Sequence, residues 1–213
     1  MSDMDIFVSV GTVSNKAQEA LVEAIEKRLK SEGLNPLTLG RNYFSSDAPL
    51  KAITDLMKKC HGTVVIALER TYFPSGVERR GGNKEVSITN TMITTPWNHI
   101  EAALSYSQGL PLLVIVANGV RTEGLLEPGH DWFVQRIDPK ANALQSPEFN
   151  GILADWKLKL SNVRSSPPAP YELEKMSIGE IIFALKPKIL WGIIGGVITI
   201  IVGSFTLGAK LIG

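Results

Sequence analysis

The chain has 213 residues, which is enough for one ordinary domain and an appendage. Its formal net charge of +1 lacks the basic excess typical of nucleic-acid-binding proteins, so we expect no nucleic-acid partner. The single cysteine, Cys60, excludes an internal disulfide, and three scattered histidines without a Cys/His cluster argue against a metal site.

The first 163 residues alternate between short apolar runs and segments with helical periodicity. The run "DIFVSVG" (5–11) predicts a strand, and 15–34 predicts a helix with Asn15 as N-cap and Gly33 as its stop. A second strand–helix pair follows, and its helix over 47–60 would be capped by Asp47. The remaining expected elements are a strand at 35–40, a strand at 62–70, a helix followed by a strand in "PWNHIEAALSYSQGLPLLVIV" (96–116), a turn-rich region at 125–137 and a closing helix at 146–163.

This alternation predicts an α/β fold in which helices cover both faces of a parallel sheet. In such folds ligands bind beyond the carboxyl ends of the strands. The loops at those ends are "SVGTVSN", "LGRNYFSSD", "ERTYFPSG" and "VANGVRTEG", which are rich in Gly, Asn and hydroxyl groups. They supply five candidate ligand-binding residues: Gly11, Thr12, Arg41, Arg70 and Tyr72.

The segment 71–95 shows no clear period, which favours a long loop of the kind that is usually functional or disordered. Its residues Arg79 and Arg80, followed by two glycines and Lys84, form a cluster that suits a phosphate clamp. The competing interpretation is a solvated loop.

Four large aromatic residues follow the last predicted strand, and we expect them to serve as core or subunit-interface anchors. They are Trp132, Phe133, Phe149 and Trp156.

The C-terminal part departs from the rest in composition. A Pro- and Ser-rich linker begins at 164, and a short amphipathic segment extends to 188, with Pro187 expected to break its helix. No charge occurs from Ile189 to Ala209, which corresponds to roughly 30 Å of helix and predicts a transmembrane span over 189–210. The alternative is a buried core helix. The basic residues before the span favour a cytoplasmic N-terminal domain.

Small and hydroxyl residues recur on one face of this predicted span, which favours helix association in the membrane and hence a homo-oligomer. The alternative is that glycine is simply frequent in such helices. The residues are Gly192, Gly196, Thr199, Gly203 and Thr206.

Residues 4–160 resemble the superfamily of TIR domains and nucleoside 2-deoxyribosyltransferases. The resemblance rests on "DIFVSVGTVSNKAQEALVEAIEKRLKSEGL", "APLKAITDLMKKCHGTVVIALERTYFPSG" and "PWNHIEAALSYSQGLPLLVIV". It implies a Rossmann-like (flavodoxin/TIR-like) fold, a nucleotide ligand such as NAD or a cyclic nucleotide, and no required cofactor. It also places Glu101 at the position of a catalytic carboxylate. Thr94, Thr95 and Pro96 stand where deoxyribosyltransferases usually carry Asp and Gly-Thr.

Glu101 therefore has two interpretations. A carboxylate beside an anomeric carbon can stabilise or attack an oxocarbenium-like sugar. An acidic residue in the first turns of a helix is also common for helix stability alone. In the preceding turn, Trp97 could stack on a base or pack in the core, and Asn98 could bind a ribose.

Three functions stay open at this point. The first is a membrane-anchored effector that senses a nucleotide and assembles to perturb the membrane, a combination that the resemblance links to bacterial antiphage defence. The second is a tail-anchored NAD- or nucleoside-cleaving N-glycosidase that uses Glu101. The third is a membrane-tethered, self-assembling scaffold without a small ligand.

Overall fold

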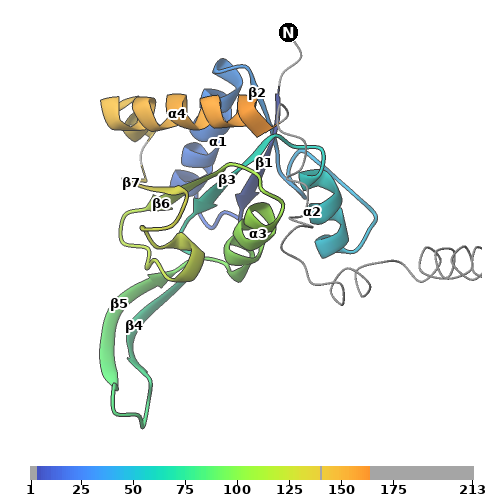
Figure 1. The fold of residues 1–213 in the computed structure, drawn as a ribbon. Helices are drawn as coiled ribbons and strands as arrows, with labels where there is room; N and C mark the ends of the chain where they lie inside the picture. Colours follow the sequence, from blue (N-terminus) through green and yellow to red (C-terminus); the bar gives the residue numbers. More distant parts are fainter. Residues whose placement is uncertain (1–3, 140, 164–213) are drawn as a thin grey trace, which may run out of the picture. The chain divides into compact units, whose positions relative to one another are not determined.

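The computed structural model describes residues 4–139 and 141–163. A parallel sheet of five strands has the order β2-β1-β3-β6-β7, formed by β1 (Met4–Val10), β2 (Leu34–Leu37), β3 (Gly62–Ala67), β6 (Leu112–Ala117) and β7 (Phe133–Ile137) (Figure 1). This is the flavodoxin-like strand order. Successive strands are added toward one edge of the sheet up to β2 and toward the other edge from β3 onward, so the order reverses between β1 and β3. The predicted α/β sheet is confirmed.

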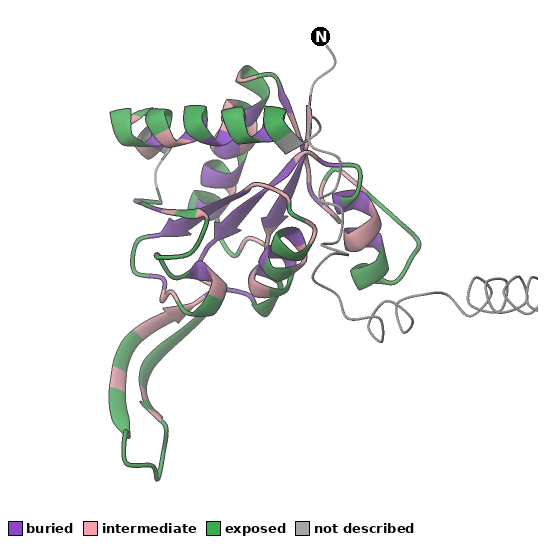
Figure 2. Cartoon of the chain, in the orientation of Figure 1, coloured by how far each residue is buried: buried purple, intermediate pink, exposed green. Residues whose placement is uncertain are grey.

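Helices cover both faces of the sheet. Helices α1 (Lys16–Ser31) and α4 (Pro147–Val163) lie on one face, and α2 (Pro49–Met57) and α3 (Pro96–Ser107) lie on the other (Figure 1). Two short 3-10 helices, η1 (Gly124–Leu126) and η2 (Ala141–Gln145), complete the connections. Figure 2 shows that burial concentrates in the sheet strands and in the helix faces turned toward them.

The strand alternation divides the core in two. Ile6 and Val8 of β1 pack in the larger cluster with α1 and α4, whereas Phe7 packs with Ile53 and Met57 of α2. Ser9 has the same parity as Phe7, so it lies on the α2/α3 side of the sheet.

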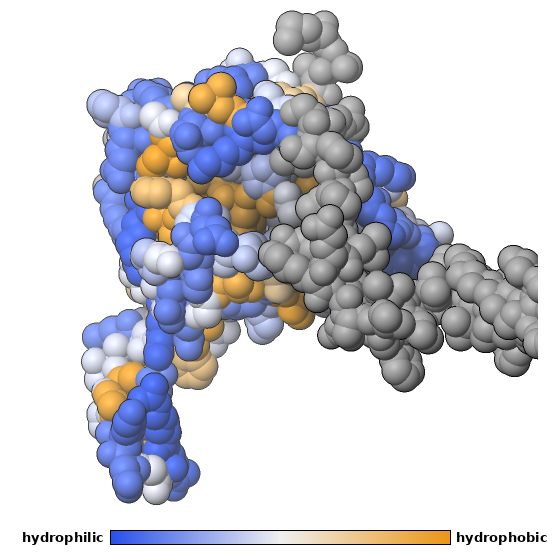
Figure 3. Space-filling model, in the orientation of Figure 1, coloured by the Kyte–Doolittle hydropathy of each residue, from blue (hydrophilic) through white to orange (hydrophobic). Residues whose placement is uncertain are grey.

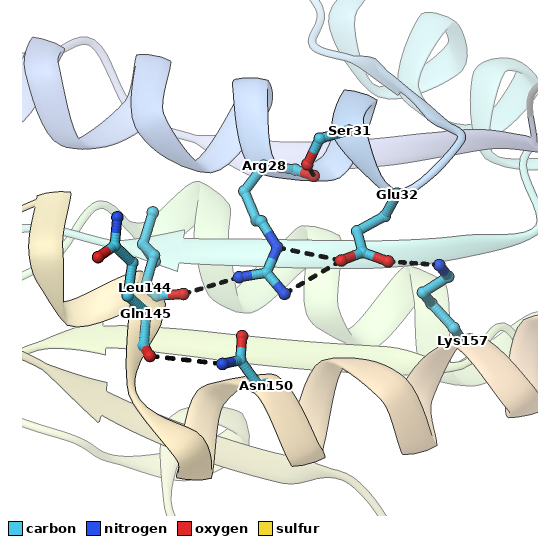
Figure 4. Close-up of polar contacts among 7 residues, drawn as sticks. All are labelled: Arg28, Ser31, Glu32, Leu144, Gln145, Asn150 and Lys157. Atoms are coloured by element: carbon cyan, nitrogen blue, oxygen red, sulfur yellow. Dashed lines mark hydrogen bonds and ion pairs between the residues drawn. The ribbon is translucent and has the colours of Figure 1, made fainter.

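Polar contacts fix α4 on α1 at the edge of this core. The Glu32 carboxylate accepts hydrogen bonds from Arg28 and, at 2.6 Å, from Lys157 of α4 (Figure 4). Arg28 also donates to the carbonyl of Leu144 in η2 at 2.8 Å. Burial of Phe149 and Trp156 beside them confirms these two aromatics as core anchors, while Phe133 is exposed.

The local capping expectations are met in part. The Asn15 side chain accepts from the Gln18 amide, and Gly33 has φ of +76° after α1, as predicted. Pro96 occupies the first turn of α3 after the cap residue Thr95. Asp47 is not the cap of α2: that residue is Ala48, and Asp47 forms an ion pair with Lys51 instead.

Two segments differ from the sequence expectation. The supposed long loop 71–95 is an antiparallel hairpin of β4 (Thr71–Glu78) and β5 (Val86–Ile93). Both of its faces are exposed, so no buried side imposes the alternation by which a strand is recognised. The turn-rich region 125–137 ends in the edge strand β7. Its polar residues Gln135 and Arg136 interrupt the apolar pattern by which a strand is recognised.

Within residues 4–139 and 141–163, no helix is both long and apolar enough to cross a membrane. The predicted linker, the predicted span 189–210 and its small-residue stripe lie outside the described residues.

Candidate functional site

Polar groups gather at the carboxyl ends of β1 and β3, where the strand order reverses. The loop after β1 and the loop after β3 are joined there by Gln18 of α1. Its side-chain amide donates to the Glu69 carbonyl at 2.9 Å, and its amide oxygen accepts from the Ser14 backbone at 2.7 Å. Crevices at such reversal points are the usual ligand sites of open α/β sheets.

The buried face of α3 is unusually polar. It consists of Asn98, Glu101, Ala102 and Ser105. An amphipathic helix packed on a sheet normally turns apolar side chains inward. Here only Ala102 does so, and the other three must find polar partners or leave polar groups unsatisfied.

Asn98 is completely buried and fully engaged. Its amide nitrogen donates to the Ser9 hydroxyl at 2.8 Å, and its amide oxygen accepts from the Thr94 hydroxyl at 2.6 Å. These bonds lock the start of α3 onto the end of β1. A ribose hydroxyl would have to compete with these bonds. In this arrangement Asn98 therefore holds Ser9 and Thr94 in place.

Glu101 lies one helical turn further along the same face, with 8% of its surface exposed. Burial raises the pKa of its carboxyl to about 7, and a hydrogen bond with Ser9 opposes that rise. Near neutral pH the group can therefore hold or release a proton. Strongly shifted carboxyls in a crevice are typical of functional sites, although structural networks also produce them.

Thr94 and Thr95, which directly precede α3, have structural roles. Thr94 bonds to Asn98, and the Thr95 hydroxyl caps the helix by accepting from the Trp97 amide at 3.4 Å. A Cβ at Gly11 would come within 3.0 Å of the Thr95 side chain. Glycine at position 11 thus allows the loop after β1 to contact the start of α3.

Two cavities flank this centre. One of about 450 Å³ lies at the ends of β1 and β2 and is lined by Val10, Gly11, Thr12, Val13, Thr38, Leu39, Gly40 and Arg41. It contains three of the predicted ligand residues, and its Val10–Gly11 wall directly follows Ser9. Another of about 210 Å³ lies at the ends of β3 and β6 beside Gln18 and Met92. Glu101 lines neither of them, and its hydrogen-bond partner Ser9 directly precedes the Val10–Gly11 wall of the first.

The charge of Arg41 is already neutralised by ion pairs within the protein. Its guanidinium pairs with Glu19 at 2.6 Å and with Glu26 at 2.9 Å, both on α1. The pKa of Glu19 is lowered by its hydrogen bond to Arg41. Two carboxylates already balance this arginine, so a phosphate would have to displace at least one of them.

The other predicted ligand residues do not join the site. Arg70 lies just before β4, where its backbone amide donates to the Ile93 carbonyl, and Tyr72 lies on β4, where it is exposed and donates to Asn90. Arg79 and Arg80 occupy the turn at the far end of the hairpin, which extends away from the sheet (Figure 1). Trp97 shares α3 with Glu101, but 42% of its surface is exposed, so it is not a core residue.

Sequence reasoning missed the hydroxyl groups of the buried network. Ser9 follows the apolar run Ile6–Val8 in β1, which was a usable signal because a buried hydroxyl needs a partner. Thr63 of β3 and Ser105 of α3 are also fully buried, and their hydroxyls have no hydrogen-bond partner among the described residues. The described part of the chain contains no group of three acidic, cysteine or histidine residues suited to a metal.

No protein-family model matches this chain, and no curated protein matches it. Solved structures with some likeness include the CMP N-glycosidase BcmB of Clostridium botulinum, with 16% identity and a TM-score of 0.34 over 53% of this chain and 71% of the other. The TIR domains of the activated Roq1 resistosome have 10% identity and a TM-score of 0.35 over 91% and 99%. The flavodiiron core Flv1 of Synechocystis has 11% identity and a TM-score of 0.44, over 76% of this chain and 37% of the Flv1 chain.

Proposed function

We propose that residues 4–163 form a nucleotide-binding domain whose ligand lies at the carboxyl edge of the sheet, with its sugar toward Glu101. The carrying observation is the buried Glu101, with a pKa near 7, bonded to Ser9 where the strand order reverses. Burial disfavours an ionised acid at this position, because desolvation is the largest influence on the pKa of Glu101. A carboxylate suits the hydroxyls of a ribose, to which it offers two acceptor oxygens.

The adjoining cavity provides room for the rest of such a ligand. Its volume of about 450 Å³ is within the range of small-molecule sites. Backbone amides of the Gly11–Thr12 loop are its natural phosphate donors, because Arg41 is already paired. For a ligand in this cavity to reach Glu101, the Val10–Gly11 segment would have to move.

Calorimetric titration of the intact protein with NAD, cyclic nucleotides and nucleosides tests the proposal. We expect one of these classes to bind, and Glu101→Gln to weaken that binding at least about tenfold through the loss of a charge-assisted hydrogen bond. Glu23→Gln, on the exposed side of α1, is the matched control and should bind as the wild type does. Binding that is equal in all three proteins removes Glu101 from the site.

A second candidate is cleavage of an N-glycosidic bond, which the pKa of Glu101 near 7 favours. The C1′–N bond would break with its electron pair leaving on the base. The ionised Glu101 would stabilise the cationic sugar and accept a proton from the water that adds to C1′. Chromatography of NAD or nucleosides incubated with the protein would detect the free base. Cleavage that survives Glu101→Gln rules out this mechanism.

At the level of the whole chain, the proposal is a membrane-anchored effector that binds a nucleotide, assembles with its copies and perturbs the membrane. It rests on the apolar sequence 189–210 and its small-residue stripe. Dye release from liposomes containing the protein, with and without the nucleotide identified above, tests it. Nucleotide binding without dye release would favour the N-glycosidase. Self-association without nucleotide binding or dye release would favour the scaffold.

A further inference from the structure

The β4–β5 hairpin is an arm that extends from the domain into solvent (Figures 1 and 2). Its base is fixed to the body by a backbone hydrogen bond from Arg121 to the Met92 carbonyl at 2.8 Å. The Arg121 side chain also pairs with Glu78 at the far end of β4. A two-stranded ribbon is marginally stable on its own in water, so an arm of this kind is expected to have a partner.

The strands of the arm carry no charge before Glu78 and expose several apolar side chains, whereas its end is charged. Tyr72, Phe73, Val77 and Val86 each expose 40% or more of their surface. Apolar patches on the arm are visible in Figure 3. The charged residues are confined to the far turn and its two flanking positions, over 78–85. An uncharged ribbon lacks the groups that would hold a phosphate backbone along its length, so its chemistry suits another strand.

The two edges of the arm differ. The edge of β4 is interrupted by Pro74, which has no amide to donate. The β5 strand carries no proline, glycine or charge from Val86 to Ile93, and these are among the devices by which proteins usually protect an open edge.

The outward backbone groups of β5 can be assigned from its base. The Met92 carbonyl bonds to Arg121 rather than to its partner Tyr72, so Met92 faces outward. By alternation Val86 and Ile88 face outward too. Asn90, with φ of +47°, ends the extended stretch, so the free edge is Val86–Thr89.

We propose that this edge pairs with the same edge of a second copy, antiparallel about a two-fold axis at Ser87. Val86 then opposes Ile88 of the other copy, twice, and the two apolar pairs lie on one face of a four-stranded sheet. Ser87 opposes Ser87, and the charged end of each arm lies beyond the paired stretch. The pairing does not depend on Glu101 or on any ligand.

This pairing stops at two copies. Once the β5 edges are joined, both outer edges of the four-stranded sheet are β4, each interrupted by Pro74. A third arm would find no continuous row of donors there. The symmetry is therefore closed, which distinguishes the assembly from a growing fibre.

Disulfide trapping of the intact protein tests the pairing and its register. In a Cys60→Ala background, Ser87→Cys places two Cα atoms about 4.5 Å apart across the axis, within disulfide range. Val86→Cys and Ile88→Cys place theirs about 7–8 Å apart on a diagonal, beyond that range. We expect oxidation to yield covalent dimer from Ser87→Cys and little from its two neighbours.

An edge variant gives the second readout. Adding Ile88→Lys to Ser87→Cys should lower the dimer yield about tenfold, because the lysine enters an apolar pair twice. Val77→Lys, at an exposed position of the outer strand β4, should leave the yield unchanged. Equal crosslinking at 86, 87 and 88, or none at any of them, overturns the proposal. So does an arm that fails to crosslink and instead binds lipid vesicles or duplex DNA, since its partner is then of another class.

Discussion

Replacing Glu101 by glutamine should make the protein more stable at neutral and alkaline pH. Burial raises the pKa of Glu101 from 4.5 to about 7, and each pKa unit corresponds to about 1.4 kcal/mol. Ionising this carboxyl in the folded state therefore costs about 3 kcal/mol. Glutamine has nearly the same shape and keeps an oxygen that accepts from Ser9, but it never ionises.

The sign follows from the raised pKa. The folded protein binds the proton more tightly than the unfolded chain does, so the contribution of Glu101 to stability is fully present below about pH 4.5. It is lost as pH rises through 7 and stays constant above that. The Glu101→Gln variant lacks this loss. Its free energy of unfolding should equal that of the wild type near pH 4 and exceed it by about 3 kcal/mol at pH 8.

Urea denaturation of both proteins at half-unit intervals from pH 4 to 9 gives this difference directly. Taking the difference between the two proteins removes the contributions of the other titrating groups that they share. Glu23→Gln, an exposed change on α1, should show no such curve. A difference that is flat with pH, or a variant less stable than the wild type at pH 8, would refute the reasoning from burial.

Four further outcomes follow from the packing and the ion pairs. Gly62→Ala should cost about 1–3 kcal/mol of unfolding free energy in denaturant titrations, because its Cβ would meet Leu160 of α4 and the Pro111 carbonyl oxygen at 3.0 Å. Gly151→Ala, open to solvent in α4, should instead stabilise by about 0.5–1 kcal/mol. Burial raises the pKa of the Cys60 thiol to about 12, so a thiol reagent at pH 8 should react with it only after unfolding. Arg41→Met should lower the melting temperature by a few degrees, on the order of 1 kcal/mol, and 1 M salt should shrink the difference.

The central strands and helices could be predicted from the sequence because burial on both faces leaves a continuous apolar record. β3 and β6 are buried at every position, and both were found. β7 was missed because it is an edge strand in which the polar residues Gln135 and Arg136 interrupt the apolar run. The arm was missed for the same reason in stronger form: neither face is buried, so its alternation carries no apolar signal.

The candidate site could be predicted only at its helix. The position of Glu101 followed from the family-like order of elements, but its environment depends on which strand lies beneath α3. Ser9 is 92 positions away along the chain, and no local pattern pairs the two residues. The ion pairs of Arg41 are long-range in the same sense, so a residue that looked free for a phosphate is balanced by α1.

The same network separates two kinds of buried polar group on α3. Asn98 is satisfied on both sides of its amide, so its burial carries little cost and its work is to join α3 to β1. Glu101 has one partner, the Ser9 hydroxyl, against a desolvation that dominates its pKa. A residue that only supported the helix would be more favourable as glutamine or leucine at neutral pH. The stability lost at Glu101 is therefore the feature that packing alone does not explain, and a ligand that approaches from the Gly11 side would meet a carboxyl already held in place by Ser9.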